Sequence, residues 1–355
     1  MEGVDWKGNY CKVENNQVTK PTDEQFKHFY ESMSESHSRL QFNDVGNVTI
    51  PILDDPITEN EVLQEAKCMN SNKTCGLDGV TPGIFKLLPG PWLLLLATLF
   101  NNLFASASYP LSWSKAKFFT IFKKGNRLNP GNYRGISVIS SIAKLYDMIM
   151  YSRLKCWFKP YREQAGGQEK RSCIEHIVCL RLLCDLARRK KLKLFVLFVD
   201  FAKAYDMVPR HMLLQILKRL GCGAVMLAAM VAMYSVTQSV IGSVLITTTL
   251  GVRQGSPTSC LLFIIYINDL IKLVKEGMGI DGFLSWLHIL VLMDDTVLLA
   301  TTRNSIIKKT QILQNYCSEY GMKVNESKTK FFVLNGANGD EEPLCVGNLR
   351  IKKCE

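Results

Sequence analysis

The chain has 355 residues, of which 47% are hydrophobic and 21% are charged. This composition is typical of a globular protein with a large core, and it excludes disordered, collagen-like and coiled-coil chains. The 43 basic residues outnumber the 32 acidic ones, so the formal net charge is +11 and the pI is about 9.0. The expected partner is therefore a polyanion, with nucleic acid first and an anionic membrane second.

The sequence gives no sign of export or of a membrane span. Its first residues, MEGVDWKGNYCK, include acidic side chains and no apolar core, so we expect no signal peptide. Its longest apolar stretches fall short of the ~20 residues that a membrane-spanning helix needs. We expect an intracellular protein, nuclear or cytoplasmic or both, that is not secreted and has no membrane partner.

The 12 cysteines are scattered without a CxxC pair, which favours reduced, buried thiols over a disulfide framework or a zinc ribbon. Cys173, His176 and Cys179 would lie along one side of a helix and could hold a metal. Because the segment is apolar and no fourth ligand is evident, core packing is the favoured interpretation.

The first half of the chain is predicted to be mainly helical. Residues 1–56 are polar and are interpreted as a leader with one helix, Asp23–Ser36, capped by Thr22 or Asp23. The capping box Thr58-Glu-Asn-Glu61 predicts the start of a second helix. The periodicity then predicts a helix over Trp92–Ala107, a strand over Lys117–Phe122, and helices over Ile139–Trp157 and Glu175–Lys191.

The second half alternates strands and helices. The predicted elements are strand Leu194–Val199, helix Pro209–Leu220, a β-rich stretch Val240–Val252, helix Pro257–Val274, strands Leu287–Met293 and Thr296–Ala300, helix Ser305–Tyr320 and strand Lys330–Leu334. This order indicates an α+β sheet close to the split βαβ plan, with helices on one face. The last twenty residues have loop composition.

Two aspartates, Asp294 and Asp295, separate two apolar strands. A hairpin turn is the ordinary interpretation, because Asp is common in turns. Tight hairpins favour Gly or Asn at positive φ, however, and Asp200 ends another apolar strand in the same way. If these strands are neighbours at ~4.8 Å, the three carboxylates meet at one edge, where cations must balance their charge. This predicts a divalent metal site suited to phosphoryl transfer.

Seven segments resemble the motifs of reverse transcriptases, in the form typical of non-LTR (LINE-type) retrotransposons. The resemblance covers about Ile57 to Leu334, in the family's order. The segments are Asn72–Gly79 (NKTCGLDG), Asn132–Ser137 (NYRGIS), Gln164–Gly166 with Arg171-Ser172, Phe198–Arg210 (FVDFAKAYDMVPR), Gln254–Phe263 (QGSPTSCLLF), Leu292–Asp295 (LMDD) and Gly321–Thr329 (GMKVNESKT). This sequence departs from the family at three places: Leu292 replaces an aromatic residue, Phe122 a proline, and Gly167-Gln168 a Phe-Arg pair.

The resemblance implies a two-metal site. Asp200, the Phe201 carbonyl and Asp294 would hold two Mg²⁺ ions, or Mn²⁺ in their place, and Asp295 would support the metal site. Lys328 would protonate the departing pyrophosphate, although a charged strand edge is an equal interpretation of this lysine.

The resemblance also implies a nucleotide site. Lys123 and Arg134 would clamp the triphosphate. The alternative is a solvated surface, which is the commoner environment of an isolated lysine. Tyr205 would lie beneath the sugar and exclude a 2′-hydroxyl, with a core aromatic as the alternative. Gln254 and Gly255 would let the backbone approach the nucleotide, with an ordinary turn as the alternative.

The implied fold is α+β, with the fingers and palm of a right-hand polymerase, a ferredoxin-like palm sheet and a thumb that is largely missing. We expect a leader at 1–56, fingers at 57–193, a palm at 194–335 and a tail at 336–355. The basic run Arg188–Lys191 is expected to face template phosphates, with a nuclear import signal or a solvated helix end as alternatives.

The implied function is RNA-directed DNA synthesis on an RNA template, with a DNA primer or nicked target DNA and dNTPs. The alternative is an inactive RNA-binding remnant. An RNA-dependent RNA polymerase is disfavoured by Tyr205, and the FAKAYD spelling favours a retrotransposon enzyme over a group II intron maturase.

Overall fold

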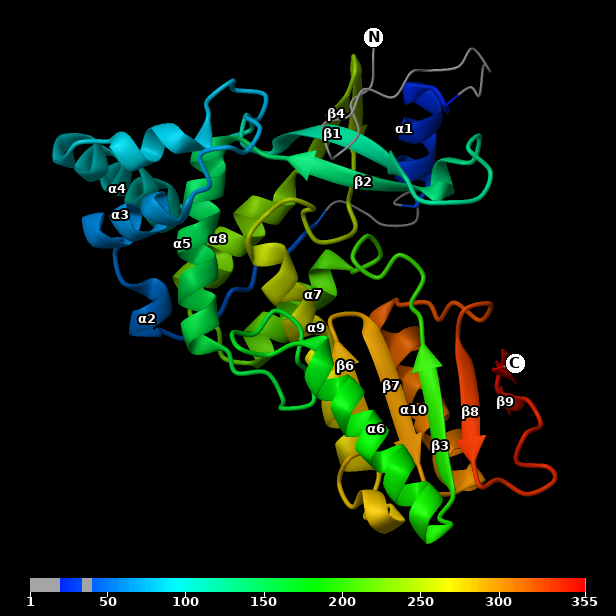
Figure 1. Cartoon of the computed structure of the whole chain (residues 1–355). Coiled ribbons are helices and arrows are strands. Elements are labelled where there is room, and N and C mark those ends of the chain that lie inside the picture. Colours follow the sequence, from blue (N-terminus) through cyan, green and yellow to red (C-terminus); the bar gives the residue numbers. More distant parts are fainter. Residues whose placement is uncertain (1–19, 34–39, 355) are drawn as a thin grey trace.

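The computed structural model describes residues 20–33 and 40–354, and its elements form an α+β architecture with two sheets (Figure 1). The helices are α1 (Asp23–Ser32), α2 (Pro51–Asp54), α3 (Glu59–Cys68), η1 (Pro82–Leu87), α4 (Gly90–Ala105), η2 (Pro130–Asn132), α5 (Ser141–Trp157), α6 (Cys173–Lys190), α7 (Arg210–Arg219), α8 (Ala224–Ser235), α9 (Thr258–Gly277), η3 (Gly282–Leu284) and α10 (Arg303–Tyr320). The strands are β1 (Lys115–Phe122), β2 (Tyr133–Val138), β3 (Leu194–Val199), β4 (Gln238–Ile241), β5 (Val244–Thr247), β6 (Ile289–Leu292), β7 (Asp295–Ala300), β8 (Lys330–Leu334), β9 (Leu344–Val346) and β10 (Leu349–Lys353).

Two predicted helix starts are confirmed by their caps. The Thr22 hydroxyl accepts a hydrogen bond from the Gln25 N–H, and the Gln25 side chain accepts one from the Thr22 N–H. Thr58 and Glu61 form the same reciprocal pair at α3. These local pairs satisfy N–H groups that have no partner within the helix, which is why the sequence alone locates them. The predicted continuation of α1 to Ser36 lies partly outside the described residues.

The C-terminal sheet has the strand order β6-β7-β3-β8-β10-β9. Strand β3 pairs antiparallel with both β7 and β8, Leu197 lying opposite Leu298 on one side and Phe331 on the other. Helices connect β3 to β6 and β7 to β8, so β6, β7, β3 and β8 have the ferredoxin-like order. The predicted split βαβ plan is confirmed.

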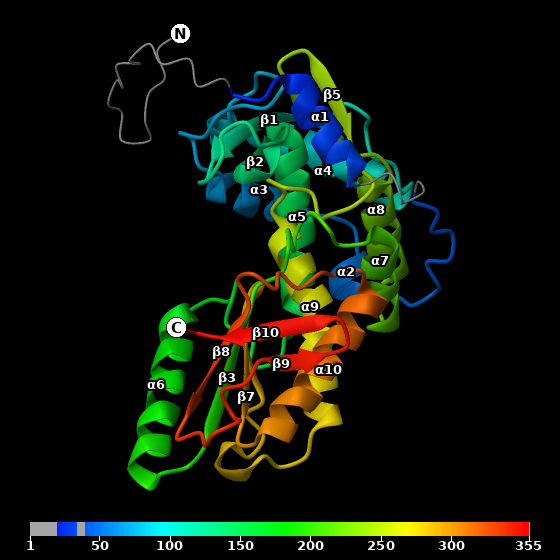
Figure 2. The same cartoon turned by 90° about the vertical axis from the view of Figure 1, so that its right-hand side faces the viewer.

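Helices cover both faces of this sheet, so the prediction of helices on one face is wrong. Along β3, Phe195 and Leu197 join the large core with α9 and α10, whereas Leu194 and Val196 join a second cluster with Ala187 of α6. Figure 2 shows α6 on one side of the sheet and α10 on the other. A strand whose side chains are all apolar needs cover on both faces, and β3 is such a strand.

The N-terminal sheet has the order β2-β1-β4-β5. It joins distant segments, since Lys115 of β1 pairs in parallel with Gln238 of β4. Helix α1 covers this sheet, with Phe26 and Tyr30 packed on Phe118. Strands β4 and β5 therefore belong to this sheet although they lie within the range expected for the palm, and the described part of residues 1–56 includes packed helices.

The absence of structure predicted for residues 336–355 is wrong, because strands β9 and β10 lie there. Leu344 and Ile351 are fully buried, and Lys352 of β10 pairs in parallel with Lys330 of β8. Helix α8 was also not predicted; it is apolar on nearly all sides and lacks the polar stripe that marks a surface helix. Within the described ranges, no helix has the length and apolar content needed to cross a membrane.

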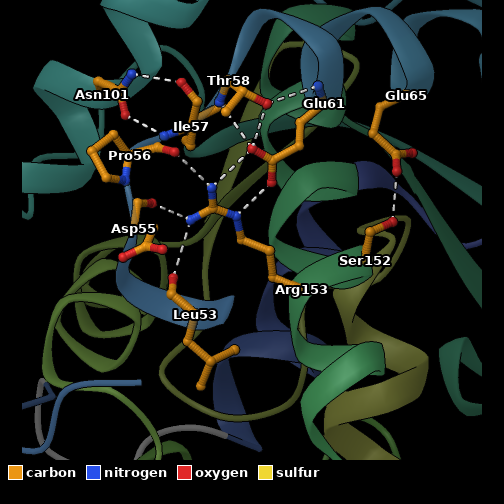
Figure 3. A network of polar contacts seen from close by, with 10 residues as sticks. All are labelled: Leu53, Asp55, Pro56, Ile57, Thr58, Glu61, Glu65, Asn101, Ser152 and Arg153. Atoms are coloured by element: carbon orange, nitrogen blue, oxygen red, sulfur yellow. Dashed lines mark hydrogen bonds and ion pairs between the residues drawn. The ribbon is translucent and has the colours of Figure 1, made fainter. Parts of the chain in front are cut away.

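A buried arginine ties the N-terminal helices to α5 (Figure 3). Arg153 donates two hydrogen bonds to the Glu61 carboxylate, at 2.7 and 3.0 Å, and three to the carbonyls of Leu53, Asp55 and Pro56. All five N–H groups of the guanidinium are thus used, and the chain between α2 and α3 is fixed to the core.

Candidate active site

Asp200 follows the last residue of β3, at one end of the C-terminal sheet, which is called the palm sheet below. Its backbone N–H donates to the Thr329 hydroxyl at 3.1 Å, and its carbonyl accepts from the Asn325 N–H at 2.7 Å. These bonds hold the Asp200 backbone against the segment that precedes β8. The neighbouring Phe201 forms an isolated β-bridge with Val324, which fixes its backbone as well.

The two other aspartates lie at the hairpin turn between β6 and β7. Leu292 pairs with Asp295, so Met293 and Asp294 occupy the tip of a two-residue turn. The hairpin expected as the ordinary interpretation is therefore present, and it places Asp294 beside the end of β3, because β3 and β7 are paired neighbours. Asp294 is half-buried, whereas Asp295 is exposed.

The electrostatics of Asp294 report the proximity of the other carboxylates. Burial raises the pKa of Asp294, and the negative charges of Asp295 and Asp200 raise it further, against the opposing effects of a backbone hydrogen bond and of Arg134. The Oδ2 atom of Asp200 is inaccessible to solvent and makes no hydrogen bond; the ammonium of Lys328 lies 3.4 Å from it. Negative charge is thus concentrated here and only partly balanced.

A cleft of about 780 Å³ contains most of the predicted site residues. It opens between the two sheets and has a polar lining. The predicted residues that line it are Lys123, Arg134, Asp200, Phe201, Tyr205, Gln254, Asp294 and Lys328. Asp295 and Gly255 are not part of the lining.

The N-terminal sheet contributes two cations to this cleft. Lys123 follows β1, and its backbone N–H donates to the Asn132 carbonyl at 2.9 Å. Arg134 lies on β2 opposite Ile121 of β1. Both side chains are exposed, and together they place positive charge across the cleft from Asp200.

Tyr205 and Gln254 form part of the cleft wall and are held from behind. The Tyr205 ring stacks on Phe263 of α9, with ring centroids 4.3 Å apart and an angle of 16° between the planes. The Gln254 amide donates a hydrogen bond to Asp206, a carboxyl whose pKa is raised by burial and lowered in part by that bond. From the FAKAYD motif we predict that Asp206 holds the motif loop by hydrogen bonds and does not bind metal, and this contact is of that kind.

The fold requires a glycine at position 255 for a reason that the neighbouring sequence does not reveal. Its φ is +85°, and a Cβ atom at this position would lie 2.0 Å from the Ser137 carbonyl oxygen of β2. The glycine allows close contact between the loop before α9 and the N-terminal sheet. It does not itself face the cleft.

Sequence reasoning missed several residues that line the cleft. Phe29 and Tyr30 come from α1, in the segment interpreted as a leader. Lys203 lies 3.7 Å above the Phe29 ring, and burial lowers its pKa. The only signal in the sequence was that Lys203 belongs to the FAKAYD motif. Its contact with Phe29 of α1 could not be predicted, because the two residues are 174 positions apart.

The donor set suits divalent cations that also bind a substrate. Within residues 20–33 and 40–354, no group of three or more His, Cys, Asp or Glu side chains gathers as a metal site by itself. Asp200 and Asp294 are two hard oxygen donors, and Mg²⁺ is commonly bound by one or two carboxylates together with substrate phosphates. The buried Oδ2 of Asp200, which makes no hydrogen bond and has only the Lys328 ammonium 3.4 Å away among the described residues, is consistent with such a ligand.

The predicted core packing of the cysteine and histidine set on α6 holds for Cys179, which packs against the second hydrophobic cluster, but not for Cys173. Cys173 is exposed, His176 and Cys179 are partly exposed, and Ile174 and Ile177 beside them retain more than 60% of their surface. Residues such as Ala187 form the inner face of α6. One part of the helix therefore packs on the sheet, and the other part faces outward.

The fold and the cleft thus define a polymerase-type palm with paired carboxylates. The sequence profile of the family described as Reverse transcriptase (RNA-dependent DNA polymerase) matches residues 121–348, and the chain belongs to this family. Reverse transcriptases generally use divalent metal ions.

Curated relatives come from mobile elements. The chain is 26% identical over 290 residues to the transposon TX1 uncharacterized 149 kDa protein of Xenopus laevis, covering 78% of this chain and 22% of that protein. It is 23% identical over 326 residues to the Pol polyprotein of retrotransposable element R2 from Nasonia vitripennis, covering 88% and 31%. The resemblance to non-LTR retrotransposon reverse transcriptases is confirmed. The chain spans between about a fifth and a third of the length of these relatives.

Solved structures of telomerase are also similar. The apo telomerase of Candida tropicalis, truncated from its C-terminal domain, matches with a TM-score of 0.45 and 14% identity, over 77% of this chain and 59% of that chain. Telomerase of Candida albicans, in complex with a fragment of telomeric RNA, matches with a TM-score of 0.46 and 14% identity, over 72% and 48%.

Proposed function

We propose that this chain is an RNA-directed DNA polymerase of the non-LTR retrotransposon type. It extends a DNA primer, or the end of a nicked target DNA, with dNTPs on an RNA template. The observation that carries the proposal is the meeting of Asp200 and Asp294 in one cleft that Lys123 and Arg134 line from the other sheet.

Asp200, Asp294 and the Phe201 carbonyl would hold two Mg²⁺ ions, or Mn²⁺, with nucleotide phosphates completing the coordination. When bound, these ions activate the primer 3′-hydroxyl and stabilise the leaving oxygen. Asp295 lies outside the cleft lining and contributes negative charge to Asp294 from the next position in the chain. Burial and the neighbouring carboxylates raise the pKa of Asp294, and a bound cation would oppose this shift by favouring the ionised carboxylate.

The remaining side chains bind and orient the nucleotide. Lys123 and Arg134 bind the triphosphate, Arg134 through paired N–H donors and Lys123 as a point charge. Tyr205 lies beneath the sugar, supported by Phe263. The Lys328 ammonium, close to Asp200, donates a proton to the departing pyrophosphate.

The domain limits and the compartment are part of the same proposal. We assign residues 57–193 to the fingers and residues 194–335 to the palm. Strands β4 and β5 lie within 194–335 but join the N-terminal sheet with β1 and β2. A polymerase of this type acts where its RNA and target DNA meet, in the nucleus or the cytoplasm.

The proposal is tested by incorporation of labelled dTTP on poly(rA) primed with oligo(dT) in the presence of Mg²⁺. The parent chain is expected to incorporate dTTP. Asp294→Asn should lose at least about 100-fold of the rate, because a metal ligand contributes several kcal/mol of transition-state stabilisation.

The matched control is Asp185→Asn, the same chemical change on α6, where the partly exposed Asp185 pairs with Arg188 at 3.6 Å. Its rate should equal that of the parent. Folded protein that binds RNA but incorporates nothing would contradict the proposal and support the RNA-binding remnant.

A further inference from the structure

The turn that carries Asp294 has an unusual backbone. Met293, at its tip, has φ +58°, a left-handed conformation that residues other than glycine seldom adopt. Such a conformation persists only where the surrounding structure enforces it. The contacts that the turn makes with other parts of the chain therefore bear on how it is held.

The support comes from residues 163–165, which run beside β6 at the edge of the palm sheet. The Val291 N–H donates to the Glu163 carbonyl at 2.8 Å, and the Ala165 N–H donates to the Val291 carbonyl at 2.9 Å. Gln164 and Val291 form a parallel bridge. The segment thus acts as a short additional strand that ends next to the turn.

The Gln164 side chain extends from this segment to the backbone of Met293. It is fully buried. Its Oε1 atom accepts hydrogen bonds from the Met293 N–H at 3.0 Å and from the Gly166 N–H at 2.8 Å, while its Nε2 atom lies 3.5 Å from the Met293 carbonyl. One amide therefore engages both polar backbone groups of the residue at positive φ.

The two glycines after Ala165 leave room for the turn. A Cβ atom on Gly166 would lie 2.6 Å from the Met293 backbone nitrogen, and one on Gly167 would lie 3.0 Å from the Met293 Cε atom. The Met293 sulfur in turn lies 3.6 Å from the Cys260 sulfur of α9. The backbone and the side chain of Met293 thus both contact segments outside the hairpin, while Met293 also lines the cleft.

We propose that Gln164 is a positioning residue for the catalytic turn: by holding Met293 in its left-handed conformation it keeps the Asp294 carboxylate in the cleft opposite Asp200. This inference rests on the proposed function, in which Asp294 is a metal ligand. Gln164 touches neither substrate nor metal and acts only through the backbone next to Asp294.

Gln164→Leu tests the proposal by removing both hydrogen-bonding atoms at similar volume. Its matched control is Gln314→Leu, the same change at a partly buried glutamine of α10 that lies against the turn between β9 and β10. Three measurements apply to each variant: hydrogen exchange of peptides spanning the β6–β7 turn, Mn²⁺ affinity by electron paramagnetic resonance, and dTTP incorporation.

Gln164→Leu is expected to accelerate exchange at the turn and to weaken Mn²⁺ binding about 10- to 100-fold, the usual effect of losing a partner that orients a metal ligand. Incorporation should fall by a similar factor and recover in part when Mg²⁺ is raised. Gln314→Leu should leave all three unchanged.

Gly166→Ala is a second variant for the case in which Gln164→Leu does not fold, because the added methyl group would displace the Met293 nitrogen. Its control is Gly279→Ala, where no atom lies within 4 Å of the added carbon. Gly166→Ala should show the same faster exchange and weaker Mn²⁺ binding.

Unchanged exchange and unchanged Mn²⁺ affinity in folded Gln164→Leu or Gly166→Ala would overturn the positioning role. A parent chain without dTTP incorporation would overturn the proposed function instead, and the exchange measurement would still decide whether Gln164 holds the turn. The two failures are therefore distinguishable.

Discussion

At the scale of single residues, Tyr205 is expected to select deoxynucleotides. Its ring lines the cleft and is held by stacking on Phe263. Tyr205→Ala would open space beneath the sugar, so the preference for dTTP over UTP, measured as the ratio of kcat/KM values, should fall about 10- to 100-fold.

Tyr205→Phe is the control, because it keeps the ring and its stacking contact and should keep the preference. Equal loss of preference in both variants would show that the hydroxyl, not the bulk of the ring, discriminates. An unchanged ratio in Tyr205→Ala would remove Tyr205 from the selection of the sugar.

The sequence predicted those site residues whose position follows from a strand end. Asp200 directly follows β3, and Asp294 lies between two apolar strands, so pairing of the strands brings both into the cleft. The role of Gln164 could not be predicted, because it depends on a contact with Met293 that is 129 positions away. Turn rules also favour Gly or Asn at positive φ and give no reason to expect Met293 there.

At the scale of elements, the contact between α3 and α5 should make stability depend on pH. The Glu61 pKa is raised by burial but lowered more by hydrogen bonds from Arg153 and Thr58, so its net shift is below the ordinary value. A lowered pKa stabilises the fold at pH values above the pKa of the unfolded chain, and this stabilisation is lost as the pH falls through the folded pKa.

Glu61→Gln should therefore lower the free energy of unfolding at pH 7 by about 1–3 kcal/mol, the range for a hydrogen bond to a charged group. The difference from the parent should shrink below pH 4.5, the ordinary pKa of a glutamate side chain. Urea unfolding at several pH values measures it. Glu65→Gln, the same change one turn further along α3 where the carboxylate accepts from Ser152 at 2.6 Å, is the matched control.

Elements were predictable where local chemistry defines them and not where tertiary contacts do. The caps of α1 and α3 and the apolar run of β3 depend on neighbouring residues only. Strand β10 has a single fully buried side chain, Ile351, and exists because β8 and β9 offer it partners. Helix α6 packs on the second apolar face of β3. The sequence shows that β3 has two apolar faces, but it does not indicate which helix covers each face.

At the scale of the whole molecule, the fold separates its positive charge into distinct regions. Lys123 and Arg134 face the cleft, whereas the basic run expected to face template phosphates, Arg188–Lys191, lies where α6 leads into β3. Asp200 follows the opposite end of β3, and six residues of strand span ~20 Å. The run at α6 therefore lies at the end of the C-terminal sheet that is remote from Asp200, and it has no place in the cleft that Lys123 and Arg134 line from the N-terminal sheet.

This separation predicts how RNA binding will respond to salt. A chain with a net charge of +11 releases counterions when it binds RNA, so the logarithm of the binding constant should fall linearly with the logarithm of the salt concentration. In the absence of dNTPs the Lys123 and Arg134 side chains have no triphosphate to bind and are available to RNA phosphates. Lys123→Ala and Arg134→Ala should then each reduce that slope by about 0.7, the value for one contact to a single-stranded phosphate. The paired change Arg188→Ala and Arg189→Ala removes two charges from the far end of the sheet and should leave the slope unchanged.

Fluorescence anisotropy of a labelled oligoribonucleotide between 50 and 200 mM salt, concentrations chosen because they give a wide range of affinity, measures the slopes. A slope that responds to the α6 pair and not to Lys123 and Arg134 would place the RNA on the opposite end of the palm from Asp200 and Asp294.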